Sequence, residues 1–404
     1  GDELLIKVAK FGGTSMATAD AVRRAVKISE RSGEIKAVAV SAGGKVTNEK
    51  KITDELIAAY PKLCEGKSEE AALKKIEERI SALCGELNIK FDLHNELMKI
   101  GREEEKTSSP DFLISRGEYL YSKIFSAVSL RPFVDSAEII RFGKEGKLDV
   151  AFSSFLIKEK FVGTGGFVTG GFYGSDRNGN IKIMPRGGGD ITGALLSLAL
   201  KADVYENYTD VDGVLPFPPD LLPKEYAFLK KKIRPLKQIS FARMRNLCDF
   251  SVNVLHPDVL KLLKGQGIDV IVKNTFNESS AGTLLSENAA YNDGEFYFAA
   301  DKFRNVKRNL EQRAFETPVY EKFLKAAKNI VLPDDFVFWF SLCDESEKII
   351  LNLKNKFKTV VAEEKPGFAL SVVEAEKSLI LSEIFGQIAD KNFLSRYHNA
   401  VTLK

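Results

Sequence analysis

Short apolar runs alternate with amphipathic stretches through the first 285 residues. Runs rich in Leu, Ile, Val and Ala at 4–9 and 37–40, together with the run VYENY at 204–208, predict strands. Apolar residues at helical spacing in 19–30 and 191–202 predict helices that follow such strands. A strand, a helix and a second strand form a βαβ unit, so the pattern predicts an α/β domain with a mostly parallel sheet.

Two longer helical segments interrupt this alternation. Residues 62–106 are rich in charge and carry apolar residues at helical spacing, which predicts a surface helical insertion. The apolar positions of this stripe are Leu73, Ile76, Ile80, Leu83 and Leu87. Residues 110–130 then predict a long amphipathic helix. Residues 132–134 and 138–142 resemble strands, 149–158 is ambiguous, and 176–180 predicts a hairpin turn rich in Asn and Gly.

The composition becomes polar at 286–293, and this change predicts a domain boundary. Beyond it, strands at 295–299, 336–342, 359–362 and 368–373 alternate with helices at 320–328, 345–357 and 378–390. This pattern predicts a small α+β region. We find no nucleophile or metal-ligand set there, so we expect residues 294–404 to regulate or dimerise the protein and residues 1–293 to carry the chemistry.

The 404 residues, 44% of them hydrophobic and 28% charged, are typical of an ordinary globular protein. The net charge of +3 is too close to balance to indicate a nucleic-acid or membrane partner. Four scattered cysteines and three histidines argue against a zinc site. We found no membrane-spanning run and no signal-peptide pattern, and we therefore expect a reduced, cytoplasmic protein.

Candidate chemistry begins at 181–214, where Arg186, Gly187, Gly188, Gly189 and Asp190 separate a short strand from a helix. Glycines before a helix let backbone N–H groups approach an anion, and the helix N-terminus adds partial positive charge. An arginine beside them suits a bidentate contact with carboxylate or phosphate. The alternative is that Asp190 is an ordinary N-cap.

A second glycine turn follows the first strand, where Lys10 precedes Gly12 and Gly13. Lys10 could neutralise charge on a transferring phosphoryl group, although a solvated lysine is the plainer interpretation. Thr53 has two interpretations as well, an N-cap or a hydroxyl beside the glycine loops. Glu118 is a glutamate in an apolar helical face, where only Arg116 or Lys123 would pair with it.

Several motifs occur together in one order along the chain. They are 10–15 (KFGGTS), Ser41, 53–54, 116–118, 186–192, 209–213 (TDVDG), 254–257 (VLHP) and 273–277 (KNTFN). With these motifs the chain resembles aspartate kinase, the amino-acid-kinase family enzyme with C-terminal ACT domains, over most of residues 4–285. The resemblance implies a three-layer αβα sandwich with a mostly parallel sheet, followed by an ACT-like α+β region.

The resemblance also implies ATP-dependent phosphorylation of the aspartate β-carboxylate, the entry to lysine, threonine and methionine biosynthesis. The catalytic pair would be Lys10 on the phosphoryl group and Asp190 orienting that lysine. The aspartate pocket would comprise Ser41, Thr53, Glu118 (α-ammonium), Phe172, Arg186 (α-carboxylate), Gly187 and Gly189. The nucleotide would contact Lys10, Gly12, Gly13, Thr14, Ser15, Thr209, Asp210 and Gly213. Mg²⁺ would be held mainly by nucleotide phosphates and water.

The chain departs from the family pattern at four places. Gly189 replaces the usual serine, LPFPPD follows Gly213, Asn253 replaces a common lysine, and residues 45–51 enlarge the loop before Thr53. We expect a homodimer formed through the C-terminal region, with weak or altered feedback by an amino-acid effector. Two rivals stay open, namely a non-catalytic regulatory paralogue that binds nucleotide or amino acid, and a kinase for a related amino acid.

Overall fold

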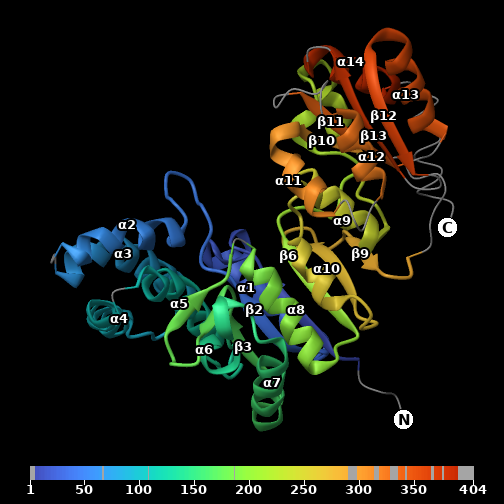
Figure 1. Ribbon diagram of the computed structural model, residues 1–404. Helices are drawn as coiled ribbons and strands as arrows, with labels where there is room; N and C mark the ends of the chain where they lie inside the picture. The colour runs from blue at the N-terminus through green and yellow to red at the C-terminus, as the bar shows by residue number, and fades with distance from the viewer. Residues whose placement is uncertain are drawn as a thin grey trace. The chain divides into compact units, whose positions relative to one another are not determined.

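The structure is a computed structural model (Figure 1), and the chain divides into two compact units. The residues that it describes are 5–65, 68–107, 109–185, 187–289, 298–313, 318–327, 335–341, 344–364, 368–374 and 377–389. The first unit comprises Gly1–Asp212 and Asp258–Leu284, and the second comprises Gly213–Pro257 and Leu285–Lys404. No helix in the described ranges combines the length and the apolar content that a bilayer crossing needs.

The first unit is built on a mostly parallel sheet whose strands follow the order β3-β2-β1-β6-β8-β9. Their bounds are β1 (Lys7–Phe11), β2 (Ile35–Val40), β3 (Phe167–Gly170), β6 (Val204–Thr209), β8 (Asp269–Asn274) and β9 (Thr283–Ser286). Strands β3, β2, β1, β6 and β8 are paired in parallel. The strands are short, and β1, β2 and β8 are rich in Val, Ile and Ala, as expected for a parallel sheet with both faces covered.

Helices cover both faces of this sheet. Their bounds are α1 (Ala19–Glu30), α2 (Ile52–Cys64), α3 (Glu69–Leu87), α4 (Leu93–Thr107), α5 (Pro110–Ser129), α6 (Ser136–Ile139), α7 (Val150–Thr164), α8 (Gly188–Leu200) and α10 (Pro257–Leu263). Successive side chains of a strand face opposite sides. Phe11 of β1 accordingly stacks on Phe125 of α5, whereas its neighbour Lys10 meets Asp190 of α8. The predicted three-layer αβα fold is therefore confirmed.

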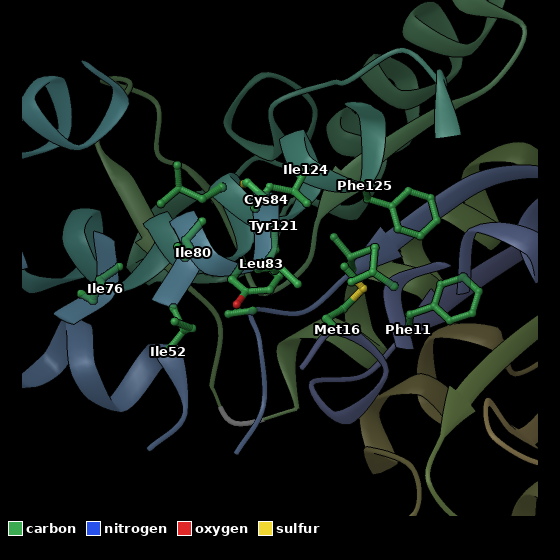
Figure 2. Close-up of a cluster of buried hydrophobic side chains, with 14 of the residues drawn as sticks. Phe11, Met16, Ile52, Ile76, Ile80, Leu83, Cys84, Tyr121, Ile124 and Phe125 are labelled. Atoms are coloured by element: carbon green, nitrogen blue, oxygen red, sulfur yellow. The ribbon is translucent and has the colours of Figure 1, made fainter. Parts of the chain in front are cut away.

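The predicted helical insertion contributes to the main core. All five residues of the stripe on α3 are at most 8% exposed. Figure 2 shows Ile76, Ile80 and Leu83 in the same cluster as Ile52 of α2 and Tyr121 of α5. The amphipathic pattern correctly predicted the buried face, and the insertion is packed into the core of the unit along that face.

Three local predictions are corrected by the structure. The strand at 181–184 is β5 (Ile181–Ile183), which pairs with β4 (Tyr173–Ser175) in an antiparallel hairpin outside the main sheet. The segment 138–142 is no strand, because Asp135 caps the one-turn helix α6 through the Ala137 N–H. The ambiguous stretch 149–158 belongs to α7, which begins at its N-cap Asp149.

The second unit contains a four-stranded antiparallel sheet of order β10-β11-β13-β12. Its elements are β7 (Gln238–Ser240), α9 (Phe241–Asp249), β10 (Phe298–Lys302), α11 (Phe303–Arg313), α12 (Pro318–Ala327), β11 (Phe336–Ser341), α13 (Asp344–Lys356), β12 (Lys358–Glu364), β13 (Phe368–Glu374) and α14 (Lys377–Ile388), with 3₁₀ helices at Pro219–Leu221 and Lys224–Lys231. The predicted α+β architecture is confirmed. The helix α11 was missing from the sequence prediction.

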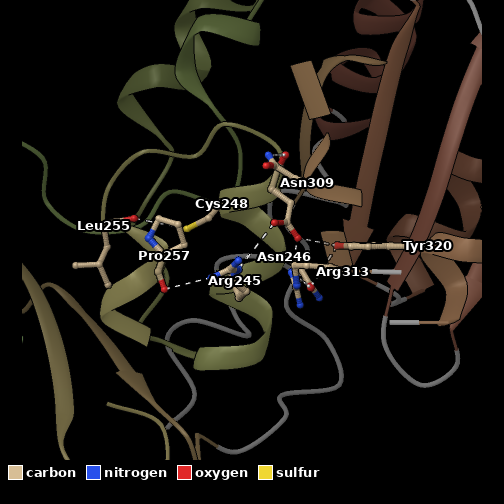
Figure 3. A network of polar contacts seen from close by, with 9 residues as sticks. Arg245, Asn246, Cys248, Leu255, Pro257, Asn309, Arg313 and Tyr320 are labelled. Carbon is tan, nitrogen blue, oxygen red and sulfur yellow. Dashed lines mark hydrogen bonds and ion pairs between the residues drawn. The ribbon is translucent and has the colours of Figure 1, made fainter. Parts of the chain in front are cut away.

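Residues 213–257 pack with the C-terminal residues of this unit. Phe217 stacks on Phe298 of β10 and meets Phe385 of α14 edge to face. A buried polar network joins α9 to α11 and α12 through Asp249, Arg313 and Tyr320 (Figure 3). The compact second unit thus includes a segment that lies before residue 293, and the division of labour between residues 1–293 and 294–404 stays a prediction.

Candidate functional site

The carboxyl end of β1 and the first turn of α8 meet at an ion pair. Lys10 Nζ lies 2.8 Å from Asp190 Oδ1 and 3.3 Å from Asn207 Oδ1, and the Asn207 amide donates to Asp190 Oδ1 at 3.1 Å. Asn207 is the register partner of Lys10 on the neighbouring strand β6, so both side chains face α8. The three residues form a closed polar cluster with a cation at its centre.

The alternative interpretation of Asp190 as an N-cap is wrong. The N-cap of α8 is Gly187, whose φ of +87° lies in the left-handed region that favours glycine. Asp190 is the third residue of the helix, and its carboxylate reaches across to Lys10 instead of capping its own helix. The structure thus brings Lys10 and Asp190 together, as the resemblance implied.

Gly189 lies in close approach to the same lysine. A Cβ atom at this position would lie 3.3 Å from Ser41 Oγ and 3.5 Å from Lys10 Cε. Ser41 follows β2, and its backbone N–H donates to Phe11 O. The carboxyl ends of β1 and β2 and the start of α8 therefore bring Ser41, Gly189 and Lys10 to one place.

Phe172 is in the left-handed region with φ of +80°, and its N–H donates to the Thr192 hydroxyl of α8. A Cβ atom on Gly188 would lie 3.0 Å from Phe172 Cα. Phe172 therefore lies against the first turn of α8. Arg186, the predicted ligand of the substrate carboxylate, lies outside the described residues.

The turn after β1 is a 3₁₀ helix, Thr14–Met16, with Gly13 as its N-cap, and α1 begins only at Ala19. The α-helix thus begins at the predicted residue, and the 3₁₀ turn lies between it and the glycines. The Gly12 N–H donates to Tyr208 O at 3.1 Å. Ser15 is fully buried, and its hydroxyl lies 2.7 Å from the Thr275 hydroxyl, so it fastens this turn to the loop after β8.

Glu118 on α5 is a buried carboxylate, 6% exposed, and its Oε2 has no hydrogen-bond partner among the described residues. Burial raises the pKa of Glu118 to about 7, opposed by a hydrogen bond from the Ala42 N–H and by the charge of Arg116. Ala42 adjoins Ser41, so the Glu118 carboxylate lies next to the segment that contacts Gly189.

The two predicted partners of Glu118 are engaged elsewhere. Lys123 pairs with Glu96 at 2.9 Å. The Arg116 guanidinium contacts the Ser115 hydroxyl and lies over three aromatic rings. Those rings belong to Phe112, Tyr119 and Tyr173, at 4.8, 4.5 and 5.0 Å from the guanidinium carbon. Glu118 thus keeps an unsatisfied oxygen of the kind that a cationic ligand group would complete.

Thr53 lies half-buried in the first turn of α2. The N-cap of α2 is Lys51, so the capping interpretation of Thr53 is wrong. The Ile52 N–H donates to Gly43 O at 3.1 Å, which ties the start of α2 to the loop after β2. The sequence predicted that this helix begins at Glu55, three residues later than the observed start at Ile52.

The segment 209–213 is braced by the loop that follows β8. Asp212 Oδ1 accepts hydrogen bonds from the amides of Asn274 (2.8 Å) and Asn277 (3.0 Å), and Thr209 O accepts from the Thr275 N–H at 2.9 Å. The Thr209 hydroxyl lies 3.3 Å from Asp210 Oδ1. Gly213, which begins the second unit, has φ of +145°.

The sequence interpretation missed roles for Asn207, Asn274 and Asn277. Asn207 lies with Glu206 in the middle of a buried strand, and these two polar residues at strand positions were the available signal. Asn274 and Asn277 belong to a motif that was recognised without a role being assigned. No group of three or more metal-ligating side chains occurs within the described ranges.

The chain is also similar to known proteins in sequence and in fold. The sequence profile of the amino acid kinase family matches residues 6–274. Aspartokinase 3 of Bacillus subtilis is 30% identical over 298 residues, which cover 69% of this chain and 63% of that protein. The chain therefore matches less than two thirds of the length of this curated relative.

Two solved structures resemble the whole chain. Aspartate kinase of Clostridium acetobutylicum superposes with a TM-score of 0.76 at 25% identity, covering 95% of this chain and all of that one. E. coli aspartokinase III, solved in complex with aspartate and ADP, gives a TM-score of 0.72 at 19% identity and covers 95% of this chain and 100% of its own. At 19% identity, the likeness to E. coli aspartokinase III shows a shared fold only.

Proposed function

The chain belongs to the amino acid kinase family, and from this premise we propose that it transfers the γ-phosphoryl group of ATP to the β-carboxylate of L-aspartate. The product is 4-phospho-L-aspartate, at the first step of lysine, threonine and methionine biosynthesis. The observation that carries the proposal is the contact of Lys10 with Asp190 at 2.8 Å beside the glycine turn of α8. The relatives named above, which are aspartate kinases, support the choice of acceptor.

In the proposed reaction a β-carboxylate oxygen attacks the γ-phosphorus, the new P–O bond forms, and the bond to the β,γ-bridging oxygen breaks to release ADP. A carboxylate is already ionised at neutral pH, so no general base is needed. Positioning and charge neutralisation supply the catalysis. Lys10 neutralises charge on the phosphoryl group, and Asp190 and Asn207 hold its ammonium in place.

The substrate amino acid would be held by opposite charges. Ionised Glu118 accepts the α-ammonium, which would satisfy its unpaired Oε2, and Arg186 binds the α-carboxylate. Ser41, Thr53, Phe172, Gly187 and Gly189 complete the pocket in this proposal. Gly12, Gly13, Thr14, Ser15, Thr209, Asp210 and Gly213 would contact the nucleotide. Mg²⁺ would arrive with the nucleotide phosphates and be held mainly by them and by water.

A coupled assay of ADP release with aspartate, with glutamate and without acceptor tests the proposal. ADP release that depends on aspartate supports it, whereas release with glutamate alone, or none with either, refutes it. We expect Lys10→Ala to lower kcat about 100-fold or more, since it removes charge stabilisation of the transition state. Arg186→Ala should chiefly raise the KM for aspartate. Wild-type behaviour of both variants would refute the site assignment.

The same proposal assigns residues 294–404 to homodimerisation in a cytoplasmic enzyme, with weak or altered feedback by an amino acid. Isothermal titration of the full chain with lysine and with threonine tests this regulatory part. Tight binding of either amino acid would refute it. Sedimentation of the full chain measures the oligomer independently of activity.

A further inference from the structure

The loop at 45–51 contains six exposed residues out of seven, so apolar burial does little to fix its position. It turns at Asn48, whose φ is +64°, and the Glu49 N–H donates to Val46 O at 3.1 Å. The loop nevertheless connects two parts of the candidate site, namely the glycines that follow Ser41 and the first turn of α2 with Thr53. Something other than core packing must hold it.

Arg79 on α3 makes two contacts with this loop and a third with Gly44, the residue directly before it. Its Nε lies 3.1 Å from Glu49 Oε2, its Nη1 donates to Lys50 O, and its Nη2 donates to Gly44 O. The side chain is only 11% exposed. A planar guanidinium with donors in a fixed fork can hold two carbonyls and a carboxylate at once, which a lysine ammonium does less well.

Gly44 connects Arg79 to the glycine turn after β1, because it is hydrogen-bonded to both. Its carbonyl accepts from Arg79, and its own N–H donates to Gly13 O at 2.8 Å. The approach is so close that a Cβ atom on Gly44 would lie 2.7 Å from Gly13 O and 2.9 Å from Thr14 N. The position of Gly44 therefore bears directly on the backbone that is proposed to face the nucleotide phosphates.

We propose that Arg79 is a positioning residue that clamps the 44–51 loop and, through Gly44, sets the geometry of the turn at Gly13. Its role in catalysis rests on the proposed function, whereas its role in holding the loop does not. Loss of the clamp would let the turn shift relative to Lys10. A displacement of about 1 Å at a reacting group can cost on the order of 100-fold in rate.

The test compares Arg79→Ala and Arg79→Lys with a matched control, Arg23→Ala. Arg23 of α1 also donates to α3, through Glu86 O, and it pairs with Asp20, but within the described part of the chain it has no hydrogen bond or ion pair with residues 44–51. Three measurements on the full chain are made for each protein. They are hydrogen exchange of peptides covering 43–52 without ligand, the Kd for Mg·ADP by isothermal titration, and kcat and KM for ATP and aspartate.

We expect Arg79→Ala to speed exchange in 43–52 about tenfold, to weaken Mg·ADP binding and to lower kcat/KM by about tenfold to 100-fold. Arg79→Lys should lie between it and the wild type, and it remains informative if the alanine variant misfolds. Arg23→Ala should match the wild type in all three. Equal behaviour of Arg79→Ala and Arg23→Ala, or unchanged exchange in 43–52, overturns the proposal.

The outcome also separates this inference from the proposed function. If the wild type fails to phosphorylate aspartate, the exchange and Mg·ADP measurements still report on the clamp. Faster exchange and weaker Mg·ADP binding in Arg79→Ala would then support the positioning role of Arg79, even though aspartate would be refuted as the substrate. If exchange in 43–52 is unchanged in Arg79→Ala while the wild type phosphorylates aspartate, the positioning role of Arg79 is refuted and the proposed kinase activity is not.

Discussion

Glu118 in the first unit and Asp249 in the second are both buried carboxylates, with exposed fractions of 6% and 4%. Burial raises the pKa of each one. Their surroundings differ. Asp249 Oδ2 pairs with the Arg313 guanidinium and lies 3.2 Å from the Tyr320 hydroxyl, whereas Glu118 Oε2 has no hydrogen-bond partner among the described residues.

This difference in hydrogen-bond partners indicates that Asp249 has a structural role, whereas Glu118 is suited to bind a ligand. The Asp249 network closes on itself (Figure 3), since Asn246 Oδ1 also accepts from Arg313 at 3.1 Å. A network of this kind fixes α9 against α11 and α12, and its carboxylate oxygen is satisfied within the protein. An unsatisfied buried oxygen has a cost of about 1–3 kcal/mol, and it persists where a ligand relieves that cost. This contrast yields three predictions.

The largest expected effect is on the stability of the second unit. Asp249→Ala leaves Arg313 buried without its closest anion, which should lower the free energy of unfolding by about 3–5 kcal/mol. The chain has a single tryptophan, Trp339 of β11, and it is fully buried in this unit. Urea unfolding followed by tryptophan fluorescence therefore measures the second unit separately.

The double variant Asp249→Leu with Arg313→Met is the control, because replacing both partners of a buried pair by apolar residues is often close to neutral. We expect it to recover most of the loss. A loss below about 1 kcal/mol for Asp249→Ala would show that the buried pair contributes little, and the contrast with Glu118 would fail.

The next effect is a pH dependence of the first unit. The pKa of Glu118 is about 7 when folded and 4.5 when unfolded, so between these values the folded state binds more protons than the unfolded state. Stability therefore falls as pH rises from 4.5 to 7 and is constant above that. The difference of 2.5 units corresponds to about 3 kcal/mol at 1.36 kcal/mol per unit.

Glu118→Gln should remove this dependence, since the amide does not titrate. Urea unfolding followed by circular dichroism at pH 5 and pH 7.5 measures it, with tryptophan fluorescence marking the second unit. The free energy of unfolding should fall between pH 5 and pH 7.5 in the wild type more steeply than in Glu118→Gln. The glutamine variant should be the more stable protein at pH 7.5. Parallel pH profiles would mean that the carboxylate is solvated or paired.

The sequence identified Glu118 as a candidate site residue, but it gave no indication of the buried network around Asp249. Glu118 could be predicted as a candidate site residue because it is a charged residue within an apolar helical face, and this signal is local in the sequence. The bounds of α1 were predicted correctly at Ala19–Glu30, since Thr18 caps the helix and one face is apolar. The partners of Asp249 lie 64 and 71 residues away, and periodicity carries no information about contacts at that separation.

The same limit explains the errors. Asn207 was missed because its partner Lys10 is 197 residues distant and meets it only through the strand register. The run at β5 was correctly apolar and extended, but three residues do not specify whether a strand joins the main sheet or a hairpin. Local pattern therefore predicted an α/β domain with a mostly parallel sheet and most of its elements, whereas the pairing of polar groups required the tertiary structure.

The smallest expected effect is on substrate binding and follows from the proposed role of Glu118. Only the ionised carboxylate attracts the α-ammonium, and with a pKa of about 7 roughly one tenth of it is ionised at pH 6. The apparent affinity scales with that fraction, so the KM for aspartate should fall about tenfold between pH 6 and pH 8. Glu118→Gln should have a high KM that does not vary over this range, and Asp249→Ala should retain the wild-type profile wherever it is folded. A wild-type KM that is flat with pH, or a glutamine variant that follows the wild type, would contradict a direct contact between Glu118 and the ammonium, because no other group in this prediction changes charge between the two proteins.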